Sequence, residues 1–248
     1  LVDSLIAADI DFIKDDELQA NGPGNPLMDR AKAVMDVVHR HADRTGRKAM
    51  YAFNVSGEID EMARHTEALE RLGASCVMLS LNWVGLAGLR FLRDRTDLPI
   101  HGHRNGWGLY SRSPNIGISY PVMQAIWRMA GADHLHVNGL SNKFNETDEV
   151  VIEAARAVQA ELPGTERAPM PVFSSGQTVW QVARTFDVLG NADLLLCAGG
   201  GIMSHPAGPG AGVRSLRQAA EAAAACVPVE TYAKERPELA AALEHFRR

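Results

Sequence analysis

A lysine followed by three carboxylates gives the start of the chain the chemistry of a metal site. Lys14, Asp15, Asp16 and Glu17 end the motif DFIKDDE, directly after two apolar residues. Adjacent carboxylates repel one another and cannot be buried unless a cation balances them. Clustered oxygen donors of this kind suit Mg²⁺, which binds one or two carboxylates together with waters and substrate oxygens. The alternative is a solvated acidic loop, the usual form of such a charge run.

Two pairs of histidines have the spacing of side chains on one face of a strand. His101 and His103 lie two residues apart, as do His134 and His136. Arg104 follows His103 and offers a planar, bidentate anchor for a carboxylate or a phosphate. Within each pair the histidine nearer the strand end, His103 or His136, is the better candidate for function, and the other is expected to support it. The alternative for each is a hydrogen-bonded core residue.

Glycine-rich turns and one loop lysine complete the candidate residues. Gly176 ends the segment SSG, and Gly199 and Gly200 begin the segment GGGIMSHP. The N–H groups of such glycines can bind a phosphate, although glycine also closes tight loops without a ligand. Ser174 opens the SSG segment and would hydrogen-bond a substrate hydroxyl. Lys143 lies in the segment VNGLSNK, on a loop that could close over a substrate; an ordinary exposed lysine is the alternative.

Short apolar runs that alternate with amphipathic segments predict an α/β fold. The first strand is expected within residues 9–13, where a helix ends. Further strands are expected at 48–55, 75–82, 98–104, 133–138, 170–174 and 193–198. Helices are expected at 26–45, 59–72, 85–95, 121–130, 149–162 and 178–189, and from 212 onward. Apolar runs of this kind are typical of parallel strands covered on both faces.

The positions of the polar residues favour a (β/α)8 TIM barrel over a doubly wound sheet. Such residues follow nearly every predicted strand, and a barrel brings all strand ends to one rim, where active sites lie. A doubly wound sheet would use only those near its switch point. The predicted strands are one fewer than the barrel needs, and residues 1–8 have the pattern of a helix without its preceding strand. We therefore expect the strand that precedes residues 1–8, the first of the eight barrel strands, to be absent, and the chain to be a fragment of a longer protein.

The composition argues against several classes of protein. The 248 residues are 46% hydrophobic, which is enough for a full core. The net charge is −5 and there is no basic run, so no nucleic-acid partner is expected. No apolar stretch reaches the roughly 20 residues of a membrane span, so no membrane association is expected, and no signal peptide is visible. Scattered cysteines without metal or disulfide spacing indicate a reducing compartment, and we expect a cytoplasmic protein.

Several of these motifs, in order, resemble the large chain of ribulose-bisphosphate carboxylase (RuBisCO). They are DFIKDDE, HGHR, GADHLH with Lys143 seven residues later, SSG, and GGGIMSHP, and the resemblance extends over residues 1–225. It implies that residues 1–248 form the C-terminal barrel domain of that family, with seven visible βα units followed by C-terminal helices. It also implies an N-terminal α/β domain that is missing from this chain.

The resemblance assigns a metal site to the first motif. In the family a lysine takes up CO₂ as a carbamate and completes a Mg²⁺ site with two acids, and these positions correspond to Lys14, Asp16 and Glu17. Asp15 alternates with its neighbours along the strand, so it is expected to point away and to be structural. For Lys14 the alternative is a salt bridge to the adjacent acids.

The resemblance also gives roles to the other candidates. It implies that His103 contacts substrate oxygens and moves protons, while Arg104 and His136 hold the distal anion of the substrate. Lys143 corresponds to the mobile-loop lysine, which attends the CO₂-derived carboxylate in the carboxylase. The remaining candidates correspond to the substrate and phosphate sites at two strand ends: Ser174, Gly176, Gly199 and Gly200.

Departures from the carboxylase identify a RuBisCO-like protein of the form IV type. Trp107 stands where the carboxylase has a histidine, which weakens the second phosphate site. Ser175 replaces the first glycine of the SGG turn, and the loop SGTVVGK reads VNGLSNK here. The segment LSLN at 79–82 stands where the carboxylase carries His-Asp. A bisphosphate substrate and CO₂ fixation are therefore not expected.

The retained residues define a reaction through an enediolate, which forms either by loss of a proton or by loss of CO₂ from a β-keto acid. Retention of Lys143 favours loss of CO₂. The motifs HGHRNGW and HVNG resemble the 3-oxo-isoapionate-4-phosphate decarboxylase branch, so we expect a Mg²⁺-dependent carboxy-lyase for a phosphorylated β-keto sugar acid. The alternatives are an enolase or isomerase of the methionine-salvage type (2,3-diketo-5-methylthiopentyl-1-phosphate enolase) and a non-catalytic binding barrel.

The resemblance implies an obligate homodimer or a higher assembly. In the family, the N-terminal domain of one subunit caps the barrel mouth of its partner and supplies part of the phosphate and metal environment. We therefore expect shared sites at a subunit interface, in a full-length chain well over 248 residues.

Overall fold

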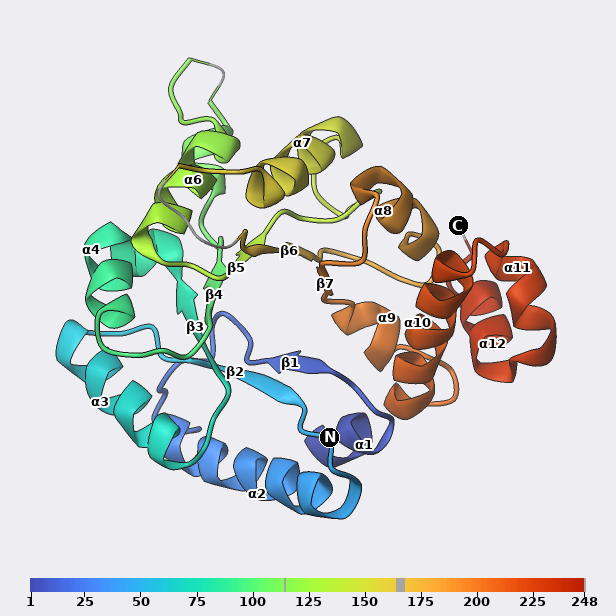
Figure 1. Ribbon diagram of the computed structural model, residues 1–248, viewed down its shortest axis with the longest axis horizontal. Coiled ribbons are helices and arrows are strands. Elements are labelled where there is room, and N and C mark those ends of the chain that lie inside the picture. The colour runs from blue at the N-terminus through green and yellow to red at the C-terminus, as the bar shows by residue number, and fades with distance from the viewer. Residues whose placement is uncertain (114, 164–167, 248) are drawn as a thin grey trace. The chain divides into compact units, whose positions relative to one another are not determined.

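The computed structural model describes residues 1–113, 115–163 and 168–247, which form two compact units. Of the described residues, the β1–β5 unit contains 11–113, 115–136, 157–163 and 168–170. The β6–β7 unit contains 1–10, 137–156 and 171–247. Figure 1 labels the helices and strands of both units along the chain.

The β1–β5 unit contains five parallel strands whose order in the sheet follows their order in the sequence. The strands are β1 (Phe12–Lys14), β2 (Met50–Asn54), β3 (Cys76–Ser80), β4 (Ile100–His103) and β5 (His134–His136). Lys14 pairs with Ala52, and Ser80 pairs with His103. A doubly wound sheet reverses its strand order at a switch point, whereas this order runs on without reversal, as in a barrel.

Helices follow the strands of this unit along the chain (Figure 1). They are α2 (Leu27–Thr45), α3 (Ile59–Arg71), α4 (Leu81–Arg93), α5 (Gly108–Ser111) and α6 (Tyr120–Ala130). In α2, Leu27, Ala31, Val34 and Val38 are buried at the three- and four-residue spacing of an apolar helix face. The helix ends at Gly46, whose φ of 73° gives the left-handed cap that glycine adopts without strain.

The sheet of the β1–β5 unit is covered on both faces. Every residue of β3 is buried, as is typical of parallel strands with an apolar layer on each side. Cys76, Met78 and Ala52 form one apolar cluster, against which Phe12 and Met50 pack. The polar residues at the carboxyl ends of β1 to β5 thus follow strands whose side chains pack in an apolar core.

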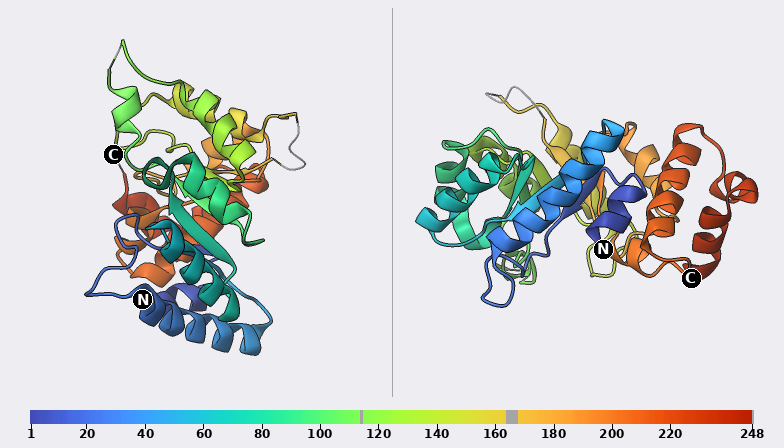
Figure 2. Two further views of the ribbon diagram at one scale, coloured as in Figure 1. Left: turned by 90° about the vertical axis from the view of Figure 1, so that its left-hand side faces the viewer. Right: turned by 90° about the horizontal axis from the view of Figure 1, so that it is seen from below.

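The β6–β7 unit contains two parallel strands and a group of C-terminal helices. Its elements are α1 (Val2–Ala7), most of α7 (Asp148–Gln159) and of β6 (Met170–Phe173), α8 (Val182–Leu189), β7 (Leu195–Leu196), α9 (Gly199–Met203), α10 (Pro209–Ala224), α11 (Val229–Tyr232), the 3-10 helix η1 (Ala233–Glu235) and α12 (Pro237–His245). Val172 and Phe173 pair with Leu195 and Leu196. Helices α10, α11 and α12 lie side by side (Figure 2) around a core that includes Leu239.

The described residues contain the predicted strands, whereas several helices have other bounds than predicted: α8 begins at Val182 instead of residue 178, and α7 ends at Gln159 instead of residue 162. α5 was not expected, and α4 begins at Leu81 rather than Gly85 because it continues across a kink where Gly85 has a φ of 68°. Gly199 to Met203 form the short helix α9, where the sequence predicted a turn. Among the described residues, every helix is too short or too polar to cross a membrane.

Candidate active site

The end of β1 places Lys14 and Glu17 close together. The Lys14 ammonium lies 3.7 Å from Glu17 Oε2 and donates a hydrogen bond to the backbone oxygen of Asp15 at 3.0 Å. Their side chains are 18% and 32% exposed, so solvent reaches both. Asp16 is exposed, and its carboxylate accepts a hydrogen bond from the Leu18 amide at 2.9 Å, which fixes the turn after the strand.

Asp15 is the buried carboxylate of the motif and lies in a fully formed hydrogen-bond network. Arg30 donates to both of its oxygens, at 3.1 and 2.9 Å. The Tyr51 hydroxyl and the Asn54 amide complete the set at 2.7 and 2.9 Å. The Asn54 side chain in turn donates to the backbone oxygens of Asp16 and Glu17. The prediction that Asp15 is structural is therefore confirmed: it anchors the loop that carries the two exposed acids.

His103 at the end of β4 faces the acidic segment. Its Nε2 lies 3.6 Å from Glu17 Oε2, and its Nδ1 lies 2.9 Å from Asn105 Oδ1. Burial lowers the pKa of His103, and the nearby Lys14 charge lowers it further, while Asn105 and Glu17 oppose the shift. Nδ1 also lies 3.2 Å from the Asn105 backbone nitrogen, so Asn105 offers this ring nitrogen an acceptor through Oδ1 and a donor through its N–H. When Nδ1 carries the proton, it donates a hydrogen bond to Asn105 Oδ1 and Nε2 keeps its lone pair beside Glu17; when Nδ1 accepts from the Asn105 N–H, Nε2 carries the proton.

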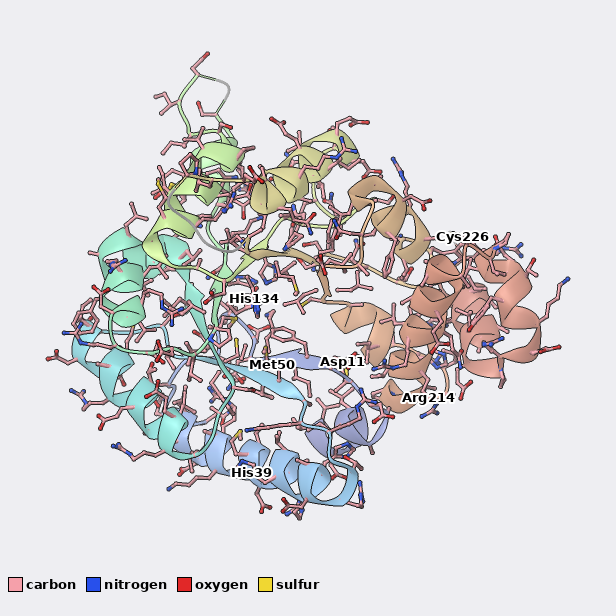
Figure 3. All side chains as sticks on the ribbon, in the orientation of Figure 1. Asp11, His39, Met50, His134, Arg214 and Cys226 are labelled. Atoms are coloured by element: carbon pink, nitrogen blue, oxygen red, sulfur yellow. The ribbon has the colours of Figure 1, made fainter. Side chains whose placement is uncertain are left out.

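The other three histidines form a buried chain across β4 and β5. His101 Nε2 lies 2.8 Å from His136 Nε2, and His101 Nδ1 lies 3.4 Å from His134 Nδ1. Burial lowers the pKa of all three, and that of His101 and His136 falls well below its ordinary value. Neutral rings can share these contacts only if the proton position on one ring sets that on the next. His101 is thus in direct contact with His136, and its supporting role stays a prediction. Figure 3 labels His134 among the strands.

Arg104 and His136 are joined through Tyr120, the first residue of α6. The Arg104 guanidinium stacks on the Tyr120 ring at 4.5 Å, and the Tyr120 hydroxyl donates to the backbone oxygen of His136. Trp107 is buried and packs against Tyr120 with ring centroids 4.8 Å apart. Trp107 is thus part of an aromatic core with Trp127, which is consistent with the loss of a phosphate-binding histidine at this position.

The Lys143 loop of the β6–β7 unit lies against the turn after β6. The Lys143 amide donates to the Ser175 backbone oxygen at 3.2 Å, and the Ser174 amide donates to the Asn138 oxygen at 3.1 Å. Gly176 has a φ of 88°, and a Cβ there would lie 3.6 Å from Lys143 Cβ. Lys143 itself is exposed, with Nζ 5.4 Å from the centre of the Phe144 ring. The structure thus brings Lys143, Ser174 and Gly176 together in one unit.

Gly199 and Gly200 are exposed at the start of α9, and Gly201 is buried beneath them. A Cβ at Gly201 would lie 2.6 Å from the backbone oxygen of Gln177, so the close approach of α9 to the turn after β6 requires glycine there. The prediction of a glycine-rich turn is therefore wrong in form, because the exposed residues Gly199 and Gly200 belong to a first helical turn.

The residues at the end of β1 fit a Mg²⁺ site only if Lys14 is modified. Among the described residues, no three His, Cys, Asp or Glu side chains are arranged to hold a metal. Asp16 and Glu17 supply two carboxylates, and Lys14 Nζ lies close enough to Glu17 for a carbamate to add a third anionic oxygen donor. Such an all-oxygen set suits Mg²⁺.

The fold and the site define the class of protein. Parallel strands in sequence order, each followed by a helix, with polar side chains at the strand ends of each unit, are the elements of a (β/α) barrel of the α/β class. The chain belongs to the family of the ribulose bisphosphate carboxylase large chain, catalytic domain, whose model matches residues 1–246.

Curated relatives cover nearly the whole chain. It is 54% identical to a 3-oxo-isoapionate-4-phosphate transcarboxylase/hydrolase of Xanthobacter autotrophicus, over 99% of the chain and 60% of that protein. It is 42% identical to a 3-oxo-isoapionate-4-phosphate decarboxylase of Rhizobium etli, again over 99% of the chain and 60% of the relative. The chain thus spans about 60% of the length of these relatives.

A solved structure has the same fold. A rubisco-like protein from Burkholderia fungorum is 48% identical, with a TM-score of 0.95 over 99% of this chain and 61% of that one. This similarity confirms the predicted barrel and the RuBisCO-like assignment.

Sequence reasoning missed the residues that position the site. Asn105 follows Arg104 directly and could have been found as part of the same strand end. Tyr120 precedes a proline at a helix start, and nothing in that pattern indicated a contact with Arg104 and His136. Glu146, which accepts a hydrogen bond from Asn138, is one of many acidic residues, and nothing in its local sequence indicates that contact.

Proposed function

We propose that this chain is the catalytic barrel of a RuBisCO-like carboxy-lyase that acts on 3-oxo-isoapionate 4-phosphate or a closely similar phosphorylated β-keto sugar acid. The observation that carries the proposal is the similarity, over almost the whole chain, to proteins named for this substrate. In a β-keto acid, the electron pair of the bond to the departing carboxylate passes toward the ketone oxygen. CO₂ leaves, and the resulting enediolate takes up a proton at carbon.

The β1–β5 unit would supply the charge and proton chemistry. Mg²⁺ held by a Lys14 carbamate, Asp16 and Glu17 would provide positive charge for the developing enediolate. His103, neutral because of its burial, can accept or return a proton through Nε2. Arg104 offers a bidentate anchor for an anionic group, held in place by the Tyr120 ring.

The remaining candidates would bind the ends of the substrate. His136 presents a neutral ring whose proton position depends on His101. Ser174 would donate to a substrate hydroxyl, and Lys143 would attend the carboxylate that is lost. The phosphate would bind to the backbone N–H groups of three glycines: Gly176, Gly199 and Gly200.

A transcarboxylase/hydrolase reaction is the second candidate, because the Xanthobacter autotrophicus relative with that name is 54% identical and the Rhizobium etli decarboxylase only 42%. Both reactions break the bond to the carboxyl group. In the decarboxylase reaction the carboxyl group leaves as CO₂. In the transcarboxylase/hydrolase reaction it passes to another carbon and stays in a non-volatile product, and water is consumed in the hydrolysis.

A carboxyl-labelled substrate distinguishes the candidates. The full-length protein, with Mg²⁺ and bicarbonate, would be given 3-oxo-isoapionate 4-phosphate carrying ¹³C in its carboxyl group and followed by NMR. A decarboxylase releases the label as CO₂ and bicarbonate. Label in a non-volatile cleavage product supports the second candidate, and an isomer that keeps every carbon supports the enolase alternative. Failure to convert or bind the substrate would reject both candidates.

Lys143→Met should slow loss of the carboxyl group far more than it weakens phosphate binding. An interaction with the departing carboxylate acts on kcat, whereas the phosphate contacts act on affinity. Stopped-flow turnover and calorimetry with a phosphate-bearing product analogue measure the two separately. Lys32→Met on the exposed side of α2 is the matched control. Equal losses of turnover and of analogue affinity would contradict the role.

A further inference from the structure

Two neighbouring segments of the β6–β7 unit carry strained residues at positions where the carboxylase has glycine. Asn138 and Ser175 have φ values of 68° and 70°. Counting back from Lys143, Asn138 occupies the first glycine of the carboxylase loop, and Ser175 occupies the first glycine of its SGG turn. A positive φ is an unfavourable backbone conformation for residues other than glycine, and it is more unfavourable for serine than for asparagine. Retention of this backbone shape without glycine indicates that the side chains themselves have a role.

The side chains of Asn138 and Ser175 are hydrogen-bonded to each other. The Ser175 hydroxyl donates to Asn138 Oδ1 at 2.8 Å, and Asn138 Nδ2 donates to the Glu146 carboxylate. Because the amide oxygen and nitrogen each have a defined partner, the orientation of the Asn138 side chain is fixed. We call these three residues, Asn138, Glu146 and Ser175, the latch.

The latch encloses the lysine loop on both sides. Asn138 and Glu146 lie before and after Lys143 in the sequence, and the Lys143 amide bonds to the Ser175 backbone oxygen at 3.2 Å. Inside the loop, Asn142 Nδ2 donates to the backbone oxygens of Gly139 and Glu146, each at 3.0 Å. Every one of these contacts joins the loop to itself or to the turn after β6.

The base of the Lys143 loop is tightly packed against the turn after β6. Gln177 is fully buried and donates to the Leu140 oxygen at 3.1 Å. A Cβ at Gly139 would lie 2.5 Å from the Ser174 backbone oxygen. The loop therefore rests directly on the turn, with glycine at the point of closest approach.

We propose that Asn138, Glu146 and Ser175 are positioning residues that hold the Lys143 loop against the turn after β6 before substrate binds. Glycines at positions 138 and 175 would leave the loop free to open, whereas hydrogen-bonded side chains at these two positions of positive φ keep it in place. An effect of the latch on turnover rests on the role proposed for Lys143 under the proposed function, whereas the hydrogen bonds of the latch are independent of that role.

Variants of Ser175 separate strain from hydrogen bonding. Ser175→Gly removes both the hydroxyl and the unfavourable φ, so the thermal midpoint should stay unchanged or rise while the loop loosens. Ser175→Ala removes the hydroxyl and keeps the strain, so the loop should loosen equally and the midpoint should fall. Ser141→Gly is the matched control, because Ser141 has a φ of 49° in the same loop and its hydroxyl has no hydrogen-bond partner among the described residues.

Hydrogen exchange of the peptide covering residues 138–147 in the full-length protein measures the loop directly. We expect both Ser175 variants, and Asn138→Gly, to speed exchange at the Lys143 amide roughly ten-fold, and the Asn138→Gly/Ser175→Gly double variant to add little more. Ser141→Gly should not speed it. Unchanged exchange in the Ser175 variants, or fully additive effects in the double variant, would overturn the latch whatever reaction the protein catalyses.

Turnover of the same variants tests the positioning role. A displaced Lys143 should lower kcat roughly ten-fold with little change in KM, since ground-state binding of the phosphate does not use the loop. A looser loop with unchanged kcat would overturn the positioning role and leave the proposed reaction intact. If the wild-type protein lacks the proposed activity, the proposed function fails, and the exchange experiment still decides whether the latch exists.

Discussion

At the scale of single residues, the acidic motif contains two kinds of carboxylate that look alike in the sequence. Asp15 is 4% exposed and saturated by hydrogen bonds from its own unit, whereas Asp16 and Glu17 are accessible. The alternation of side chains along a strand predicted this division. The partners of Asp15 could not be predicted, because Arg30 and Tyr51 come from a helix and a strand that only the folded chain brings to it.

Asp15→Asn should destabilise the protein by about 3–5 kcal/mol, because it leaves the largely buried Arg30 guanidinium without its counter-charge. Urea unfolding measures this loss. The control is Asp11→Asn, which breaks the solvent-exposed ion pair with Arg47 and should cost about 1 kcal/mol or less. Similar losses for the two variants would contradict a structural role for Asp15.

Lys14→Ala should abolish turnover and also the bicarbonate dependence of Mg²⁺ binding. A carbamate at Lys14 supplies an anionic oxygen that alanine cannot, so Mg²⁺ would lose a ligand beside Asp16 and Glu17. Titration of the full-length protein with Mg²⁺, with and without bicarbonate, reads out the site without relying on activity. Bicarbonate-independent Mg²⁺ affinity in the wild type, or Mg²⁺-dependent turnover in the variant, would reject the carbamate.

At the scale of elements, the buried histidine chain of β4 and β5 makes stability depend on pH. His101 contacts His134 and His136, and the Phe12 ring packs against it in a tilted arrangement. Burial opposes the protonation of His101 most, and the charges of protonated His134, protonated His103 and Lys14 add to this effect and lower its pKa. Because the folded pKa values lie below the unfolded value of about 6.5, the unfolded chain binds more protons in acid. The contribution of these neutral, buried histidines to the free energy of unfolding is therefore fully present above pH 6.5 and is lost as the pH falls below that value.

The free energy of unfolding should fall between pH 7.5 and 5.5, with a slope below pH 6.5 of about 1.4 kcal/mol per pH unit for each buried histidine. Urea unfolding at several pH values measures the slope. His101→Asn should be less stable at pH 7.5 but show a shallower fall. The control is His39→Asn on the exposed side of α2 (Figure 3). An identical slope in His101→Asn would show that these rings are not the source of the pH dependence.

The sequence predicted strands and long helices well because apolar spacing carries their signal. It failed at short elements rich in glycine. α9 consists of Gly199, Gly200 and Gly201 with two further residues, and glycine is a poor helix former, so the run reads as a turn. The close approach of Gly201 to Gln177 decides the helix instead, and such a contact leaves no pattern in the local sequence. The latch also leaves no pattern in the local sequence, because Ser175 lies 37 residues from Asn138 and only the folded chain brings them together.

At the scale of the whole molecule, we propose that the active form is a homodimer with two shared sites. The resemblance to the RuBisCO family implies that one subunit caps the barrel mouth of the other, and the chain spans only about 60% of its curated relatives. The β1–β5 unit also exposes large apolar side chains on and around α5 and α6: Leu109, Ile116, Ile118, Val122 and Met129. Apolar groups gathered along one segment in this way are typical of surfaces that bind another protein.

Light scattering after size exclusion should therefore give the full-length protein at least twice its single-chain mass. Activity should fall on dilution through the dissociation range, because each site would lose the residues that the partner supplies. Val122→Asp places an unpaired charge among the exposed apolar side chains and should weaken association by about 1–3 kcal/mol. Lys32→Asp on α2 adds the same side chain away from them and serves as the control. A monodisperse full-length protein that is fully active at its single-chain mass would reject the shared site.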